Sequence, residues 1–270
     1  MPAPPLDGIL LITGASSGIG AEFARILAGS ARALVLVARR RERLDALAAE
    51  LTAARPGLAV HVRAVDLSDV ASIFPLLDEI EATIGPIDVV VNNAGFGDMD
   101  LIERAAWPKL QQMIAVNVAA LTALTWRLVP GMVKRGRGGI LLMSSGYGLT
   151  WTPAAATYVG TKYFVSGFSE SLRAELGGTG VVVTQVCPGP VATEFEAVAG
   201  FPAGLVVPGF LQISARTCAE QAVRGFARNR ALVIPGWRSW LIVTAGRLTP
   251  DWLLRIAYLG VGRLLRRRIA

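Results

Sequence analysis

The chain has 270 residues, enough for one large α/β domain or two small ones with a sizeable core. Its formal net charge of +7 indicates an anionic partner, and the candidates are cofactor phosphates, nucleic acid or a membrane surface. Nucleic acid is the least favoured partner, because much of the excess charge sits in two local arginine clusters, 39–41 and 266–268.

The cysteine and histidine content and the N-terminal residues argue against further classes of protein. Two isolated cysteines and one histidine, with no C-x-x-C spacing, argue against a metal site or a disulfide framework. Residues 1–7 have neither the basic nor the apolar region of a signal peptide, so we expect a cytoplasmic protein. The hydrophobic fraction of 53% exceeds the usual range of about 45–50%, which predicts some exposed apolar surface.

The first motif is a glycine-rich turn between a strand and a helix. Residues 9–12 form an apolar run typical of a buried parallel strand, residues 13–20 read TGASSGIG, and residues 22–27 have a helical pattern. Glycines let the backbone approach a pyrophosphate, and a helix N-terminus offers free N–H groups. The alternative is a plain tight turn, but the flanking elements favour dinucleotide binding. We assign the cofactor to Gly14, Ser16, Ser17, Gly18, Ile19 and Gly20.

The second predicted strand, 33–37, ends at Ala38 and a run of arginines. An NAD-preferring site is expected to carry an acidic residue about twenty positions past the glycines, to accept the ribose 2′-OH. Arg39 stands at the strand end instead, and a guanidinium there suits the 2′-phosphate of NADP. The arginines that follow are interpreted as solvated on the next helix: Arg40, Arg41 and Arg43.

Two further strands, 60–65 and 87–91, end in polar residues. Helical stretches at 44–54 and 70–84 separate these strands, which predicts right-handed βαβ crossovers and a parallel sheet. Ligands bind such sheets at the carboxyl ends of the strands. The cofactor candidates at these ends are Asp66, Leu67, Asn93, Ala94 and Gly95.

The middle of the chain carries a possible proton donor. Tyr158 and Lys162 are four residues apart in a predicted helix, 157–176, so they share one face with Cβ atoms about 5–6 Å apart. A nearby cation would lower the phenol pKa from its usual value of about 10 and make Tyr158 a usable acid. The alternative is an ordinary tyrosine beside a solvated lysine. The chain has only three lysines, which favours a role for this amine.

The remaining predicted elements complete the pattern. A long helix over 107–134 is predicted to be interrupted near Asn117. This residue is either packed in the core with its hydrogen bonds satisfied or functional. The fifth strand, 140–143, ends at Ser144 and Ser145. The sixth, 181–186, ends in CPGPVAT at 187–193.

In the order and spacing of these motifs over residues 8–236, the sequence resembles the short-chain dehydrogenase/reductase family. The resemblance implies a doubly wound, Rossmann-like parallel sheet of about seven strands, with helices on both faces. It implies hydride transfer between a nicotinamide cofactor and a carbonyl or alcohol carbon, in a homodimer or homotetramer. Further cofactor contacts carried over from the family pattern are Pro188, Gly189, Val191 and Thr193.

The resemblance also assigns catalytic roles. Tyr158 would be the acid/base, Lys162 would lower its pKa and hold the nicotinamide ribose, Ser145 would polarise the carbonyl, and Asn117 would hold a relay water. Some NADP-dependent relatives carry a basic residue where this chain has Ser17, which leaves the 2′-phosphate more dependent on Arg39.

The substrate side is predicted to be apolar. Residues 194–214 should form a flap, and 197–215 contain no charge. Its apolar side chains form either a lid or ordinary core: Phe195, Phe201, Leu205, Val206, Val207, Phe210 and Leu211. Tyr147, Leu149 and Trp151 would add walls. These features predict an NADP-dependent reductase of a lipophilic ketone. The alternative is a non-catalytic NADPH sensor or scaffold, but all four catalytic positions are occupied.

The tail, residues 237–270, lies beyond the usual end of the family and is interpreted as an extension to a catalytic domain of residues 1–236. Its longest apolar piece, 240–245, is far shorter than the roughly 20 residues that span a bilayer. Residues 251–270 form a basic amphipathic helix, typical of an anchor on the inner membrane surface or of a helix packed on a partner subunit. We favour the membrane surface.

Overall fold

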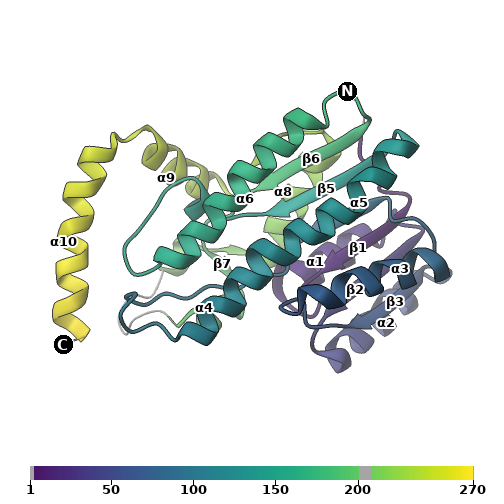
Figure 1. Ribbon diagram of the computed structural model, residues 1–270, viewed down its shortest axis with the longest axis horizontal. Helices are drawn as coiled ribbons and strands as arrows, with labels where there is room; N and C mark the ends of the chain where they lie inside the picture. The colour runs from purple at the N-terminus through teal and green to yellow at the C-terminus, as the bar shows by residue number, and fades with distance from the viewer. Residues whose placement is uncertain (1–2, 201–207, 270) are drawn as a thin grey trace.

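A parallel sheet forms the centre of the structure (Figure 1). The computed structural model describes residues 3–200 and 208–269. Within these residues, seven strands pair in parallel in the order β3-β2-β1-β4-β5-β6-β9. Their bounds are β1 Ile9–Thr13, β2 Ala33–Ala38, β3 Ala59–Ala64, β4 Val89–Asn92, β5 Gly138–Met143, β6 Val181–Val186 and β9 Leu232–Val233.

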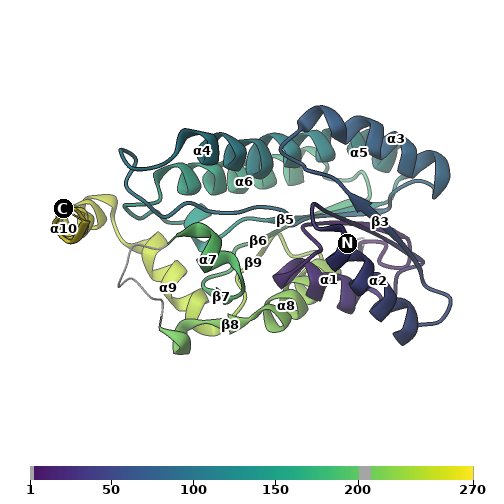
Figure 2. The same cartoon turned by 90° about the horizontal axis from the view of Figure 1, so that it is seen from below.

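Helices cover both faces of this sheet (Figure 2). One face carries α1 Gly18–Leu27, α2 Arg41–Ala54 and α8 Ala215–Ala227, and the other carries α3 Ile73–Thr83, α5 Leu121–Arg135 and α6 Ala156–Glu175. The central strands β1, β2, β4, β5 and β6 are buried throughout, so each face packs its own apolar core. The predicted doubly wound fold is confirmed.

The strand order places the ligand site. It reverses between β1 and β4, and an open α/β sheet binds its ligand at the carboxyl ends of the strands beside such a switch point. The predicted strands agree with the structure to within two residues at most ends, and β6 matches fully. The helix after the glycine turn begins at Gly18 rather than at the expected Glu22, because the turn leads directly into it.

The predicted interruption near Asn117 is a π-helical turn, Ala115–Ala120, between α4 Trp107–Ile114 and α5. The continuous stretch Trp107–Arg135 is long and apolar enough to cross a membrane by length and composition. However, 44% of its apolar window is buried in the fold, where α5 packs against β5 and α3. It is therefore best explained as a core helix.

The segment after β6 folds into short elements. β7 Val191–Ala192 pairs with β8 Ile213–Ser214, and α7 Phe195–Ala199 lies between them in the chain. Several residues of the predicted lid lie outside the described residues: Phe201, Leu205, Val206 and Val207.

The tail forms two helices, α9 Trp237–Leu248 and α10 Asp251–Ile269. α9 packs closely on two loops, since a Cβ on Gly189 would lie 2.4 Å from Ser239 Oγ and one on Gly146 would lie 3.0 Å from Val243. α10 stands at the end of the molecule (Figure 1). The domain boundary at residue 236 stays a prediction, although α9 is in contact with the catalytic domain.

Candidate active site

A cavity of about 770 Å³ runs along the carboxyl edge of the sheet. Every residue that the sequence analysis assigned to the cofactor lines it, from Gly14 in the glycine turn to Thr193 after β7. Ser145, Tyr158 and Lys162 line it too. Of the predicted site residues, only Asn117 lies behind the wall, 1% exposed. Strand ends that are far apart in the sequence therefore build one site.

The glycine turn leaves room for phosphate groups. Gly14 and Gly18 have φ angles of +66° and +54°, where a side chain would be strained. A Cβ on Gly14 would lie 2.8 Å from the Asn93 side chain, and one on Gly20 would lie 2.2 Å from the Gly14 carbonyl oxygen. Ser17 makes no side-chain capping bond to α1, and the first residues of this helix, Gly18, Ile19 and Gly20, line the cavity. The turn fits the pyrophosphate of a dinucleotide.

Asn93 supports this turn from behind. Its Nδ2 donates to the carbonyl oxygen of Thr13 at 2.9 Å. The Thr13 hydroxyl accepts from the backbone N–H groups of Asn93 and Ala94, each at 3.0 Å. These bonds tie the end of β4 to the end of β1. The direct cofactor contact expected of Asn93 stays a prediction.

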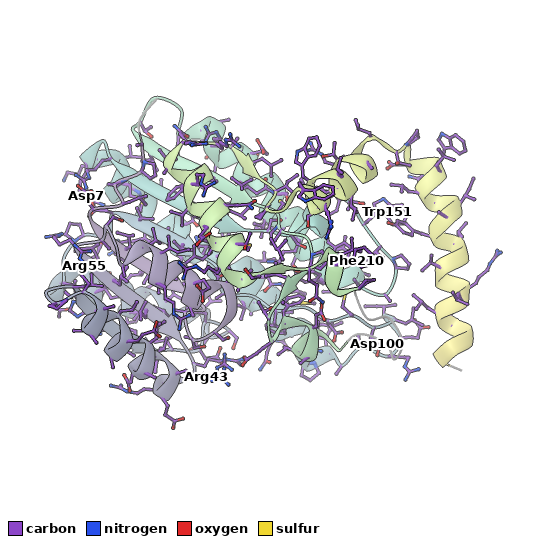
Figure 3. The ribbon with its side chains drawn as sticks, turned by 180° about the vertical axis from the view of Figure 1, so that it is seen from behind. Asp7, Arg43, Arg55, Asp100, Trp151 and Phe210 are labelled. Atoms are coloured by element: carbon purple, nitrogen blue, oxygen red, sulfur yellow. The ribbon has the colours of Figure 1, made fainter. Side chains whose placement is uncertain are left out.

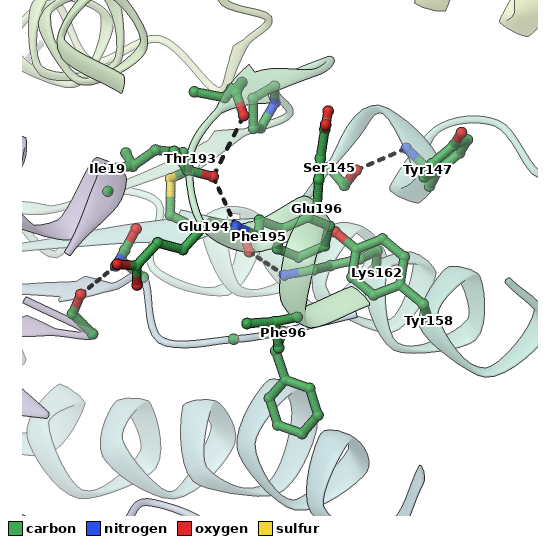
Figure 4. A pocket seen from close by; sticks show the side chains of 18 of the residues that line it. Ile19, Phe96, Ser145, Tyr147, Tyr158, Lys162, Thr193, Glu194, Phe195 and Glu196 are labelled. Atoms are coloured by element: carbon green, nitrogen blue, oxygen red, sulfur yellow. Dashed lines mark hydrogen bonds between the residues drawn. The ribbon is translucent and has the colours of Figure 1, made fainter. Parts of the chain in front are cut away.

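Ser145, Tyr158 and Lys162 meet at the other end of the cavity (Figure 4). β5 ends just before Ser145, while α6 carries Tyr158 and Lys162 one turn apart. Hydrogen bonding with Ser145 lowers the pKa of the Tyr158 phenol, and the Ser145 hydroxyl accepts from the Tyr147 N–H at 3.2 Å. The Lys162 ammonium lies 5.8 Å from the centroid of the Tyr158 ring and donates to the Met143 carbonyl at 2.9 Å.

Burial dominates the pKa values of this group. It raises the pKa of the Tyr158 phenol well above its ordinary value, and the bond with Ser145 offsets only part of that rise. Burial also lowers the pKa of Lys162, to about 8. The Lys162 ammonium is bonded to Met143, and the shift of the phenol pKa comes mainly from burial; the lowering expected from Lys162 stays a prediction.

Asn117 acts here as a support. Its Nδ2 donates to the Phe96 carbonyl at 2.9 Å and to Thr161 Oγ1 at 3.1 Å, and its Oδ1 accepts from the Phe96 N–H at 3.2 Å. These bonds fix the loop after β4 against α6, next to Lys162. The relay water expected at Asn117 stays a prediction.

The arrangement suits proton transfer to a carbonyl oxygen. A carbonyl oxygen becomes an alkoxide when its carbon receives a hydride, unless a proton donor is in place. The raised pKa keeps the Tyr158 phenol protonated, and the role of Ser145 in polarising the carbonyl stays a prediction. A bound nicotinamide supplies the hydride. Among the described residues, no group of three or more His, Cys, Asp or Glu could hold a metal ion.

Arg40 and Arg43 differ from their interpretation as solvated residues. Arg40 Nη2 donates to Ser17 Oγ at 2.6 Å and to Ser16 Oγ at 3.2 Å, while Nη1 pairs with Glu194 at 2.9 Å. Arg43 pairs with the same carboxylate at 2.6 Å. Arg40 immediately precedes α2, which directs its side chain back toward the glycine loop. Neither Arg40 nor Glu194 was singled out from the sequence as a site residue.

Arg41 keeps its interpretation as a solvated residue, whereas the role of Arg39 in NADP selectivity stays a prediction. Arg41 is exposed and pairs with Asp45, one turn along α2, at 3.4 Å. Arg39 lines the cavity near Asp66. Hydrogen bonding from Ser68 lowers the pKa of Asp66, and the charge of Arg39 contributes to the shift.

Comparison with known proteins identifies the family. A family model described as short chain dehydrogenase matches residues 8–200. The chain belongs to the short-chain dehydrogenase family. It is 32% identical to an uncharacterized oxidoreductase from Myxococcus xanthus, over 92% of this chain and 94% of that protein. It is 34% identical to a very-long-chain 3-oxoacyl-CoA reductase from Phaeosphaeria nodorum, over 84% and 67%.

Solved structures agree with this assignment. A short-chain dehydrogenase from Sphingobium yanoikuyae in complex with NADPH shares 32% identity at a TM-score of 0.78, covering 89% of this chain and 93% of that one. A bulky-bulky ketone specific alcohol dehydrogenase from Comamonas testosteroni shares 26% identity at a TM-score of 0.74, covering 92% of each. The protein is thus an oxidoreductase that transfers hydride between a nicotinamide cofactor and a carbonyl or alcohol carbon.

The predicted walls of this short-chain dehydrogenase are partly correct. Tyr147 lines the cavity, whereas Leu149 and Trp151 are not part of its lining. Trp151 instead packs against Tyr258 of α10 (Figure 3). In the predicted lid, Phe195 and Leu211 line the cavity, but Phe210 points outward and is 66% exposed.

The tail of the dehydrogenase supplies a wall that the sequence analysis missed. The lining residues from α9 and α10 are Ser239, Ile242, Val243, Val261 and Leu265. The loop after β4 and the helix after it add Phe96, Met99, Gln112 and Val116. Leu265 is only 5% exposed, and Arg266 holds α10 to the opposite loop through a 2.7 Å pair with Glu103. The apolar periodicity of the tail was visible in the sequence, but not the surface that it covers.

Proposed function

We propose that this dehydrogenase is an NADPH-preferring reductase of lipophilic ketones, or the corresponding alcohol dehydrogenase. The observation that carries the cofactor preference is Arg40, which brings a guanidinium to the hydroxyls of Ser16 and Ser17 in the glycine loop. Ala38 ends β2, so no carboxylate stands there to accept a ribose 2′-OH. The NADPH in the Sphingobium yanoikuyae relative supports the same preference.

The substrate class follows from the lining beyond Tyr158. Apolar side chains from four parts of the chain line this end: Phe96, Met99, Phe195, Leu211, Val243 and Leu265. Such a surface favours a hydrocarbon substrate over a sugar, because it offers few partners for hydroxyl groups. Two relatives, a very-long-chain 3-oxoacyl-CoA reductase and a bulky-bulky ketone specific alcohol dehydrogenase, support this class.

The test is a series of ketones of increasing chain length, with NADPH or NADH as the reductant, followed by the absorbance of the reduced cofactor. We expect kcat/KM to rise with chain length and to be higher with NADPH. A preference for short polar substrates would contradict the substrate class, and a preference for NADH would contradict the cofactor.

We also propose that the enzyme works at the cytoplasmic, inner surface of a membrane. α9 and α10 expose several large apolar side chains: Trp237, Trp240, Leu241, Trp252, Ile256 and Leu259. Arg238, Arg247, Arg255 and Arg263 lie on the same two helices, which contain one acidic residue, Asp251. Tryptophan and arginine beside an apolar face favour an anionic lipid surface as the partner.

A homodimer or homotetramer does not need this tail. α5 and α6 expose Trp126, Tyr163 and Phe164 on the face away from the sheet. That apolar surface is a separate candidate for contact between subunits. We therefore propose that α5 and α6 serve self-association, and that the tail faces lipid.

A further inference from the structure

The Glu194 carboxylate is held between two arginines at the rim of the glycine loop. Its Oε2 pairs with Arg40 at 2.9 Å, and its Oε1 pairs with Arg43 at 2.6 Å. Arg40 also donates to Ser17 at 2.6 Å, so one guanidinium connects the carboxylate with the loop. Figure 4 shows Glu194 on the side of the cavity near Ile19 of α1. A carboxylate of the chain itself thus takes up the positive charge at this end of the cavity.

A phosphate monoester would bind the same two guanidinium groups. It carries a charge of about −1.5 to −2 near neutral pH and accepts paired hydrogen bonds from guanidinium groups. Hydrogen bonds from Arg43 and Arg40 lower the pKa of Glu194 to about 2, so this side chain stays ionised at neutral pH. Two anions that share the same guanidiniums repel each other, so one must leave when the other binds.

We propose that Glu194 is a specificity-determining residue that competes with the cofactor 2′-phosphate for Arg40 and Arg43, so that phosphate binding displaces the carboxylate. This inference rests on the proposed preference for NADPH. The three side chains are 43–50% exposed, so solvent can replace each ion pair as it breaks. Competition at such a site lowers the affinity for the 2′-phosphate without preventing binding.

Glu194 also sits between the two ends of the site. Thr193, just before it, lies close to Gly18, since a Cβ on that glycine would be 3.2 Å from the threonine methyl. Phe195, just after it, begins α7 and places its ring centroid 5.6 Å from that of Tyr158. The Glu194 carbonyl accepts from the Val198 N–H at 3.2 Å, so a shift of Glu194 on displacement is transmitted to the start of α7, beside the catalytic tyrosine.

Calorimetry on the full-length protein tests the competition. The probes are adenosine 2′,5′-bisphosphate, which carries the 2′-phosphate, and adenosine 5′-monophosphate, which lacks it. We expect Glu194→Gln to bind the bisphosphate about three- to tenfold more tightly, as for the loss of one or two exposed ion pairs. The affinity for the monophosphate should not change.

The matched control is Glu196→Gln, which makes the same change of charge two residues further on. The Glu196 carboxylate accepts from Gln212 at 3.0 Å and pairs with no arginine among the described residues, so this variant should keep the wild-type ratio of the two affinities. Unchanged or weaker bisphosphate binding by Glu194→Gln overturns the proposal. If the wild type nevertheless prefers the bisphosphate, the cofactor proposal stands. If neither protein prefers it, both proposals fail.

Hydrogen exchange tests the displacement itself. In the wild type, the bisphosphate should speed amide exchange in α7, residues Phe195–Ala199, relative to the monophosphate. Glu194→Gln should show no such difference, since its side chain is no longer an anion held by the arginines. Equal α7 exchange with both probes in the wild type overturns the displacement.

Discussion

The ring of Tyr258 in α10 meets the ring of Trp151 edge-on, with centroids 4.7 Å apart. Trp151 belongs to the loop that follows Ser145, so this contact attaches the C-terminal helix to the catalytic loop. Val261 and Leu265, further along the same helix, line the cavity. The pair therefore holds one wall of the substrate site in place.

Loss of this ring contact should affect large substrates. We expect Tyr258→Ala to raise KM for bulky ketones about two- to tenfold, because an aromatic pair is worth about 0.5–1.5 kcal/mol. KM for a small ketone should hardly change. Trp252→Ala, which removes an exposed ring from the same helix, is the matched control. Equal effects on small and bulky ketones would contradict this role for α10.

Removal of the Tyr158 hydroxyl should separate binding from turnover. Tyr158→Phe keeps the ring, which packs against Tyr147 and Phe195, but removes the proton donor. We expect NADPH to bind as in the wild type, by fluorescence titration, while kcat falls by about 10²–10⁴. Tyr163→Phe, on the exposed side of the same helix, should keep its activity. Undiminished turnover by Tyr158→Phe would eliminate Tyr158 as the acid.

The buried ammonium of Lys162 makes stability depend on pH. Its pKa is about 8 in the folded protein against 10.5 ordinarily, so below pH 8 both states are protonated and the folded state bears the full penalty. Between pH 8 and 10.5 the Lys162 amine is largely neutral in the folded state but still protonated in the unfolded state. The cost of burying the charged ammonium is therefore removed, and the free energy of unfolding rises with pH.

Denaturant unfolding of Lys162→Met at several pH values checks this effect. Relative to the variant, the wild type should gain stability across that window, on the order of 3 kcal/mol in total. Other groups that titrate there are common to both proteins and cancel in the difference. A difference that is constant with pH would show that the ammonium carries no such penalty.

Cofactor choice should depend on Arg40 more than on its neighbour Arg41. Arg40→Ala removes a charged donor from the glycine loop, and such a bond is worth about 1.5–3 kcal/mol, so KM for NADPH should rise roughly 10- to 100-fold. KM for NADH should change little. Arg41→Ala removes the same charge from the exposed pair with Asp45 and should leave both values near wild type. Equal losses with NADH and NADPH would indicate that Arg40 does not recognise the 2′-phosphate.

The membrane proposal is tested best by substitutions on the exposed face of the tail. A chain that ends at Gly236 would also lose Ser239 and Val243, which are buried in the site. Ile256 and Leu259 are 64% and 61% exposed, so Ile256→Asn with Leu259→Asn should leave folding intact. We expect this double variant to sediment less with phosphatidylcholine vesicles that contain phosphatidylglycerol.

The salt dependence of vesicle binding and a control variant distinguish a lipid partner from a partner subunit. Wild-type sedimentation should fall as the screening length shortens from about 10 Å at 0.1 M salt to about 3 Å at 1 M. Trp126→Ala on α5 should change the oligomeric state, by light scattering, without changing the vesicle binding. Loss of self-association in the tail variant, with vesicle binding unaffected, would assign the tail to the subunit interface.

Structural features that depend on a few consecutive residues could be predicted from the sequence. The apolar runs of β1 and β6, the TGASSGIG turn and the spacing of Tyr158 and Lys162 each lie within a few consecutive residues. The apolar composition of a strand, the preference of glycine for unusual turns and helical periodicity are local properties, so the family and the fold could be predicted.

Which distant groups meet depends on the three-dimensional packing of the chain. Arg40 and Glu194 are 154 positions apart, and nothing in either segment indicates that their side chains pair at 2.9 Å. The pKa of Tyr158 likewise depends on burial among segments remote in sequence, which is the largest cause of its rise. The helical pattern of the tail predicted a helix, but the surface that it covers depends on how α9 fits against Gly189 and Gly146. Such contacts depend on packing in three dimensions, which local pattern does not specify.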